Sequence, residues 1–107
     1  MKKWDIQYHD LAKSSIETLP SKLLAKYYAL VDRMIELGPN LGEPHTKVIG
    51  NNLFELRIKA QEGIARVFYC TMINKEIWML HSFIKKTQKT PLKELKIAHI
   101  RLKDIIK

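Results

Sequence analysis

Hydrophobic and polar residues alternate at the start of the chain. Trp4, Ile6 and Tyr8 are separated by single polar residues, and this period of two predicts a short strand over Lys3–Tyr8 with one buried face. Three later segments are rich in β-branched and aromatic residues and are separated by short turn-forming stretches. They predict three more strands, which hairpins would join into an antiparallel meander: Leu53–Lys59, Ile64–Ile73 and Glu76–Ile84.

Two helices are predicted between the first strand and the meander, and one after it. Asp10 is a candidate N-cap for a helix that runs to about Leu19, and a second helix begins after Pro20. The second helix ends at Gly38 and carries an apolar stripe: Leu24, Tyr27, Tyr28, Val31, Met34 and Ile35. The last helix begins with Thr90 as N-cap, followed by proline, and carries a second stripe: Leu92, Leu95, Ala98, Leu102, Ile105 and Ile106.

Turn-forming and polar residues fill the segment from Pro39 to Asn52, which is therefore predicted to be a loop. The element order of strand, two helices, three strands and helix predicts an α+β fold in a single domain that spans residues 1–107. We expect the helices to cover one face of the sheet and to leave part of the other face for function.

The charge balance is strongly basic. Lys and Arg number 19 against 11 Asp and Glu, which gives a net charge of +8 at pH 7. Such an excess on a small surface attracts polyanions, so nucleic acid or an acidic protein is the expected partner; a basic surface that only serves solubility would carry the same charge. The lone Cys70 excludes an internal disulfide, and neither a signal peptide nor a membrane helix is apparent. We therefore expect a cytoplasmic protein without membrane contact.

The alternation of side chains along the strands predicts a cluster of cations. Arg57 and Lys59 share the face of their strand that lies opposite the apolar side chains. Arg66, on the next strand, would stand beside them in a suitable hairpin register. The last strand places four side chains on one face: Met79, His81, Phe83 and Lys85. Taken alone, Arg57 fits a surface ion pair with Glu55, and Arg66 fits a solvated sheet face. Their convergence favours a phosphate site.

Metal-free cleavage of RNA needs cations that stabilise charge on the phosphorane and groups that move protons. Arg and Lys meet the first need. His81 is one candidate for proton transfer, and a Lys whose pKa is lowered by neighbouring cations is the other; His81 also fits a partly buried histidine satisfied by a backbone group. The remaining histidines show no metal-ligand spacing, and no phosphate-binding glycine loop is present, so we expect neither a metal nor a cofactor.

Three segments carry a more specific pattern: Leu53–Arg57, Arg66–Tyr69 and Leu80–Pro91, with Glu94, Ala98 and Arg101 following. In these segments, and in general pattern over nearly the whole chain, the sequence resembles the RelE/HigB superfamily of toxins, specifically its phage-derived HigB-like branch. The resemblance implies an endoribonuclease that cleaves messenger RNA in the ribosomal A site by attack of the 2′-hydroxyl on the adjacent phosphate. It also implies a cognate helix-turn-helix antitoxin, with which the toxin could form a hetero-oligomer that binds operator DNA.

The resemblance also implies a set of site residues. Three of them look like the basic residues that such toxins place around the scissile phosphate: Arg57, Lys59 and Arg66. Lys85 and Lys86 occupy the strand end where the family puts further basic catalytic residues. Lys89 adds positive charge for RNA binding in the segment that leads into the last helix.

The chain departs from parts of the superfamily because no tyrosine follows Tyr69. Phe83 or His81 is therefore the candidate to replace such a tyrosine in base stacking or proton transfer. The alternative to an enzyme is a non-catalytic basic module that binds nucleic acid or an antitoxin as a transcriptional co-regulator.

Overall fold

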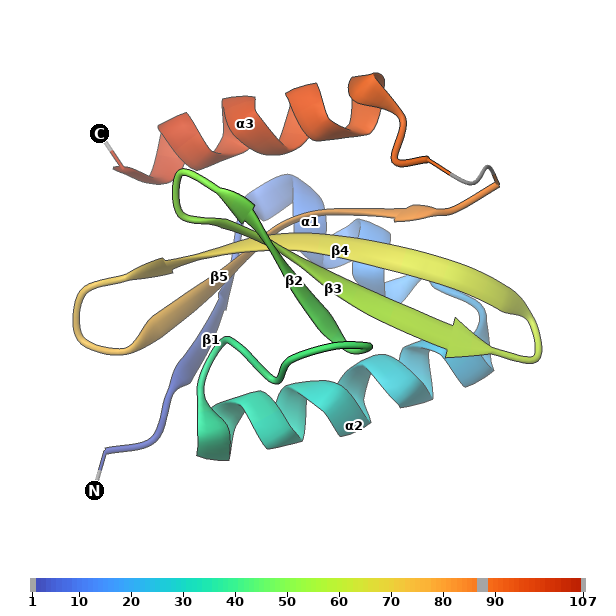
Figure 1. Cartoon of the computed structure of the whole chain (residues 1–107), viewed down its shortest axis with the longest axis horizontal. Coiled ribbons are helices and arrows are strands. Elements are labelled where there is room, and N and C mark those ends of the chain that lie inside the picture. The colour runs from blue at the N-terminus through green and yellow to red at the C-terminus, as the bar shows by residue number, and fades with distance from the viewer. Residues whose placement is uncertain (1, 87–88, 107) are drawn as a thin grey trace.

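The computed structural model describes residues 2–86 and 89–106, which form five strands and three helices (Figure 1). Along the chain they are β1 (Asp5–Tyr8), α1 (Asp10–Glu17), α2 (Ser21–Leu37), β2 (Thr46–Gly50), β3 (Leu53–Ala60), β4 (Gly63–Met72), β5 (Glu76–Ile84) and α3 (Leu92–Ile106). The predicted α+β class is confirmed. None of the described helices is long and apolar enough to cross a membrane.

The strands form one sheet in the order β1-β5-β4-β3-β2. β1 runs parallel to β5, and the other neighbours are antiparallel. The predicted meander is therefore confirmed as β3, β4 and β5. Asn74 and Lys75 join β4 to β5 with φ angles of 65° and 57°, as the two central residues of a tight hairpin require.

β2 lies in the segment that was predicted to be a loop. Thr46–Gly50 pairs with β3, and Asn51 and Asn52 make the turn between them with φ angles of 52° and 63°. Asparagine tolerates this left-handed conformation, so the two turn-forming residues close a hairpin. The loop prediction is wrong here because β2 is a short edge strand whose side chains are largely exposed, from Lys47 to Ile49, and show no alternation.

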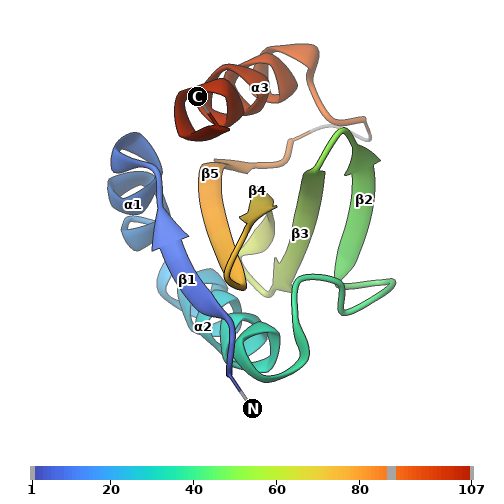
Figure 2. The same cartoon turned by 90° about the vertical axis from the view of Figure 1, so that its left-hand side faces the viewer.

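Helices cover both faces of the sheet, and the expectation of one covered face is wrong (Figures 1 and 2). Side chains of α1 and α2 form the larger core with one face. α3 packs on the opposite face, where Ala98 and Leu102 join Phe68 and Leu80 in a smaller core. Lys59 is exposed at the end of β3. The face that carries α3 therefore also has an open part.

Two helix details differ from the sequence prediction. His9, and not Asp10, caps α1, because its Nδ1 accepts a hydrogen bond from the N–H of Leu11 at 3.2 Å. In α2, Tyr27 is buried whereas Tyr28 is 45% exposed. The apolar face of α2 is thus turned slightly from the predicted stripe, and its buried residues are Leu23, Tyr27, Leu30, Val31 and Met34.

Candidate functional site

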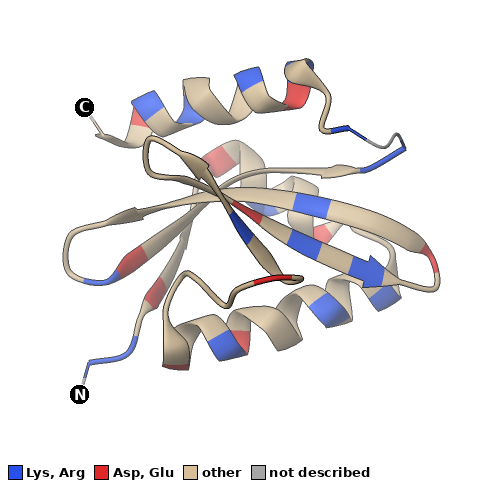
Figure 3. Cartoon of the chain, viewed as in Figure 1, with Lys and Arg blue, Asp and Glu red and all other residues tan. Residues whose placement is uncertain are grey.

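Basic residues of neighbouring strands lie close together towards one end of the sheet (Figure 3). Arg57 of β3 stands directly opposite Arg66 of β4, so the hairpin register that the predicted cluster required is confirmed. Two rungs further along, Lys59 pairs with Ile64. On the other side of β4, the backbone N–H of Lys85 donates to the carbonyl of Ile64 at 2.8 Å. The strands therefore bring four predicted site residues to one end of the sheet.

A bulge in β5 changes which of its side chains share a face. Phe68 pairs with His81, but the next residue, Tyr69, pairs with Met79, which leaves Leu80 as the extra residue. Met79 lies in the core under α1 and α2, whereas His81 contacts α3. The predicted common face of Met79 and His81 is wrong, because one extra residue reverses the alternation of side chains.

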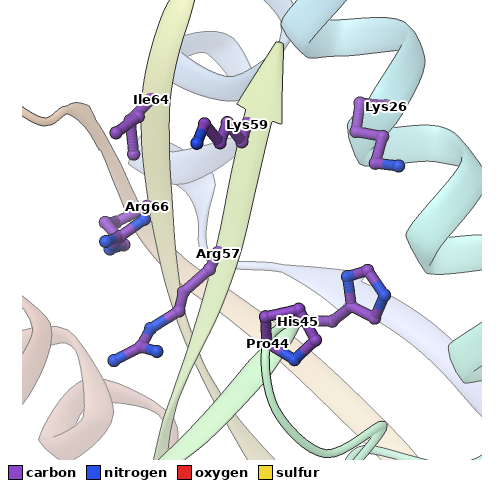
Figure 4. A pocket seen from close by; sticks show the side chains of 7 residues that line it. All are labelled: Lys26, Pro44, His45, Arg57, Lys59, Ile64 and Arg66. Carbon is purple, nitrogen blue, oxygen red and sulfur yellow. The ribbon is translucent and has the colours of Figure 1, made fainter.

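A cavity of about 350 Å³ opens beside the paired arginines (Figure 4). Its walls come from α2, the segment before β2, β3 and β4: Lys26, Pro44, His45, Arg57, Lys59, Ile64 and Arg66. The N–H of Arg57 donates to the carbonyl of His45 at 2.7 Å, which fixes the segment before β2 against β3. Four cations and one histidine around a small cavity suit a phosphate group.

Sequence reasoning missed Lys26 and His45. Lys26 is one of two exposed lysines on α2, and His45 lies in the segment that was predicted to be a loop. Neither position carries a local signal for a site. Only the packing of α2 and of the segment before β2 around the end of β3 brings them to the cavity.

Arg66 is buried, with 9% of its surface exposed, and so does not lie on a solvated face. Its Nε has no hydrogen-bond partner among the described residues, and lies 3.6 Å from Oε1 of Glu55. Burial lowers the pKa of the guanidinium, Glu55 opposes that shift, and Arg57 adds to it. A buried cation with an unsatisfied N–H at a cavity would be stabilised by a bound anion.

Arg57 is held by two carboxylates. Its Nε donates to Glu55 at 3.1 Å and its Nη1 donates to Glu43 at 2.9 Å. Glu55 is only 2% exposed, and its other oxygen accepts a hydrogen bond from the hydroxyl of Thr90 at 3.1 Å. Thr90 therefore does not cap α3 as predicted. The carbonyl of Pro91 instead accepts the first hydrogen bonds of that helix.

The surroundings of Lys85 lower the pKa of its amine. Partial burial lowers the pKa of its amine and Arg66 lowers it further, while Glu55 opposes the shift and Arg57 and Lys47 add to it. A lysine among cations holds its proton less tightly than an isolated one. Lys85 therefore stays a candidate for proton transfer.

His81 lies outside the cavity lining and is 8% exposed. Its Nε2 is 2.7 Å from a carboxylate oxygen of Glu94, and Arg101 donates to its Nδ1 at 3.3 Å. Since arginine has only donors, Nδ1 is the acceptor and Nε2 carries the hydrogen. Burial lowers the pKa of His81, Glu94 opposes the shift through a hydrogen bond, and Arg101 lowers the pKa further. Side chains, rather than a backbone group, thus satisfy a neutral His81.

Two of the other predicted site residues line a second hollow. Phe83 and Lys86 line it together with Glu94, and Phe83 stacks on Phe68 with ring centroids 5.7 Å apart. Lys89 is exposed. Residues 87 and 88 of the basic segment lie outside the described residues. Within residues 2–86 and 89–106, no group of three or more His, Cys, Asp or Glu side chains is placed to hold a metal ion.

The sequence matches one protein family over most of its length. Residues 14–103 match the family described as "Phage derived protein Gp49-like (DUF891)". The chain belongs to this Gp49-like family. No curated protein matches the chain.

Two solved structures share the fold of this Gp49-like protein. The first is an Arg-to-Ala double mutant of the E. coli toxin RelE in the free state, with a TM-score of 0.64 and 13% identity over 97% of this chain and 99% of that chain. The second is the archaeal RelE-RelB complex from Pyrococcus horikoshii OT3, with a TM-score of 0.57 and 19% identity over 78% of this chain and 96% of that chain. The predicted RelE-like fold is thus confirmed.

Proposed function

We propose that this Gp49-like protein is the toxin of a type II toxin-antitoxin pair, and that it cleaves messenger RNA on the ribosome without a metal. One observation carries the proposal: four cations line the cavity at the end of β3 and the start of β4, and Nε of the buried Arg66 among them has no hydrogen-bond partner within the described residues. A phosphate of the RNA backbone would supply both the missing charge and the missing acceptor.

The chemistry follows from that placement. The 2′-hydroxyl of the RNA attacks the adjacent phosphorus, the new O2′–P bond forms, and the P–O5′ bond breaks to leave a cyclic phosphate and a 5′-hydroxyl. Arg57, Lys59 and Arg66 stabilise the charge that develops on the phosphorane oxygens. One group takes the proton of the 2′-hydroxyl, and another gives a proton to the leaving oxygen.

We favour His45 and Lys85 over His81 for proton transfer. Lys85 does not itself line the cavity, but its backbone N–H donates to the carbonyl of Ile64, which does. His45 lines the cavity, and the pKa of Lys85 is lowered by partial burial and by Arg66. Both nitrogens of His81 are already partnered by Glu94 and Arg101. In this proposal His81 supports the site, while Phe83, Lys86 and Lys89 contact the RNA beyond the scissile phosphate.

The fold also supports a protein partner. The RelE of Pyrococcus horikoshii is seen in complex with RelB, and we propose that this chain likewise binds a cognate antitoxin, of the helix-turn-helix class, in the cytoplasm. The complex of the two would bind operator DNA. In the toxin itself, the net charge of +8 suits an acidic antitoxin segment as well as RNA.

The proposal is tested by expressing the chain alone in cells and mapping the 5′ ends of messenger RNA by primer extension. We expect new ends within translated codons, which disappear when translation is blocked before induction and when Arg66 is replaced by alanine. RNA binding without any new ends would instead support the non-catalytic module that represses transcription with its antitoxin.

A further inference from the structure

An acidic side chain lies at the base of the basic cluster. Glu55 is on β3, two residues before Arg57, and is only 2% exposed. A buried carboxylate is costly unless charged or hydrogen-bonding groups surround it. From its sequence position alone, Glu55 fits an ordinary surface ion pair with Arg57. Because it is buried, its role is better judged from the groups that surround it.

The contacts of Glu55 join three parts of the site. One oxygen lies 3.1 Å from Nε of Arg57, on the same strand, and 3.6 Å from Nε of Arg66, on β4. The other oxygen accepts a hydrogen bond from Thr90, just before α3. Glu55 also lies close enough to Lys85 to oppose the lowering of the pKa of that amine. A single carboxylate thus interacts with Arg57, Arg66 and Lys85.

The register makes such a group necessary. Arg57 and Arg66 stand directly opposite one another, and like charges in that position repel and weaken the pairing of the strands. Arg66 is also buried, so little water screens its charge. One carboxylate between two guanidinium groups offsets this repulsion and still leaves the cluster positive. A phosphate can then bind to a cluster that is already assembled.

We propose that Glu55 is the internal counter-ion that holds Arg57 and Arg66 in place for the phosphate, a positioning residue that does not itself touch the RNA. It does not line the cavity, so it acts through the arginines. The part of this inference that concerns cleavage rests on the proposed function, whereas the counter-ion role does not.

Glu55→Gln should separate binding from cleavage. The substitution keeps the size of the side chain and raises the charge of the cluster by one, so RNA carrying a 2′-deoxy group at the scissile position should bind at least as tightly, with a steeper salt dependence. Single-turnover cleavage of messenger RNA on purified ribosomes should fall at least about tenfold, because the two guanidinium groups are no longer restrained. A residue that merely supports the fold would weaken binding and cleavage together.

The counter-ion role is tested without any nuclease assay, by thermal melting with and without 100 mM inorganic phosphate. Glu55→Gln should lower the melting temperature by roughly 5–10 °C. Phosphate should then raise the melting temperature of the variant by more than it raises that of the wild type. Glu36→Gln is the matched control, because Glu36 is exposed on α2 and pairs only with Lys3 in the described structure. It changes the net charge equally and should show neither effect.

The outcomes distinguish the two proposals. A wild-type chain that never cuts RNA would end the nuclease proposal, while the phosphate-dependent melting would still decide the role of Glu55. If Glu55→Gln has the melting temperature, the phosphate response and the cleavage rate of the wild type, the counter-ion role alone is overturned. If Glu55→Gln does not fold, the double variant with Arg66→Met should regain stability, because both charges are then removed; a double variant that also fails to fold would equally overturn it.

Discussion

Two polar networks lie on the sheet face that carries α3, and they are built in different ways. The first joins one carboxylate to two cations of the strands: Glu55, Arg57 and Arg66. The second joins β5 to α3: His81, Glu94 and Arg101. Both combine a carboxylate with arginine or histidine side chains, and both are largely buried. They differ in how completely their polar atoms are partnered.

In the second network both ring nitrogens of His81 have partners, and α3 covers it. In the first, the Nε of Arg66 lacks a hydrogen-bond partner among the described residues, and the cavity opens beside it. Native proteins leave few buried polar groups unsatisfied. We infer that the complete network holds α3 on the sheet, whereas the incomplete one is where an anion binds.

The largest effect expected from this comparison follows the loss of Arg66. Arg66→Ala should reduce cleavage of messenger RNA on ribosomes at least about 100-fold, because a preorganised donor at the developing phosphorane charge is removed. The variant should also lose roughly 1–2 kcal/mol of stability, since the buried Glu55 loses one of its cations. Rates must therefore be measured on protein shown by circular dichroism to be folded.

The control for Arg66→Ala is Lys13→Ala, which removes one positive charge at an exposed position of α1. It should cleave as the wild type does. If Arg66→Ala also cleaves within twofold of the wild type, the unsatisfied Nε has no part in the reaction, and the contrast between the two networks loses its functional meaning.

The pairing of Arg57 with Arg66 could be predicted from the sequence, because it depends only on alternation along two strands and on a tight hairpin. The burial of Arg66 could not, because it depends on neighbouring elements of the fold and not on the local pattern. The same reason applies to Lys26 and His45, which reach the cavity through packing alone.

The errors in the strands have local causes. β2 was read as a loop because its exposed side chains give no period, although Asn51 and Asn52 carried a turn signal. The bulge at Leu80 left no mark in the sequence and moved Met79 to the other face. Alternation therefore predicted the cluster where the ladder is regular and failed where one residue was inserted.

Arg57 should matter less than Arg66. Two carboxylates already partner it, and its side chain is 27% exposed, so water can replace part of what it contributes. We expect Arg57→Ala to reduce single-turnover cleavage by about tenfold. Arg57→Lys should recover part of this loss, because it restores the charge without the fork of donors. A loss as large as that of Arg66→Ala would show that the partnered cation, and not the unsatisfied one, dominates the site.

The second network, around His81, predicts how stability depends on pH. Burial and Arg101 lower the pKa of His81 from an ordinary value of 6.5, and the hydrogen bond that its Nε2 donates to Glu94 opposes this shift. Below about pH 6.5 His81 is protonated more readily in the unfolded chain than in the folded one. The contribution of His81 to stability is therefore present above that pH and is lost as the pH falls. The melting temperature of His81→Gln should therefore fall less than that of the wild type as the pH is lowered.

Cleavage at neutral pH sharpens the same test. His81→Gln should change the single-turnover rate at pH 7.5 by no more than a few-fold, because His81 lies outside the cavity and both its nitrogens are engaged. A loss of 100-fold in folded protein would instead return the proton-transfer role to His81 and place the chemistry in the network that looks complete.

The smallest effect is expected at the margin of the site. Lys86 is exposed beside Phe83 at the second hollow and does not line the cavity. We therefore expect it to contact a phosphate other than the scissile one. Lys86→Ala should weaken binding of uncleavable RNA by about two- to threefold at moderate salt and reduce the salt slope by about one. Lys96→Ala, on the exposed side of α3, is the matched control and should leave the slope unchanged. Equal slopes for all three proteins would confine RNA contact to the cavity, and the comparison would then rest on Arg57, Lys59 and Arg66 alone.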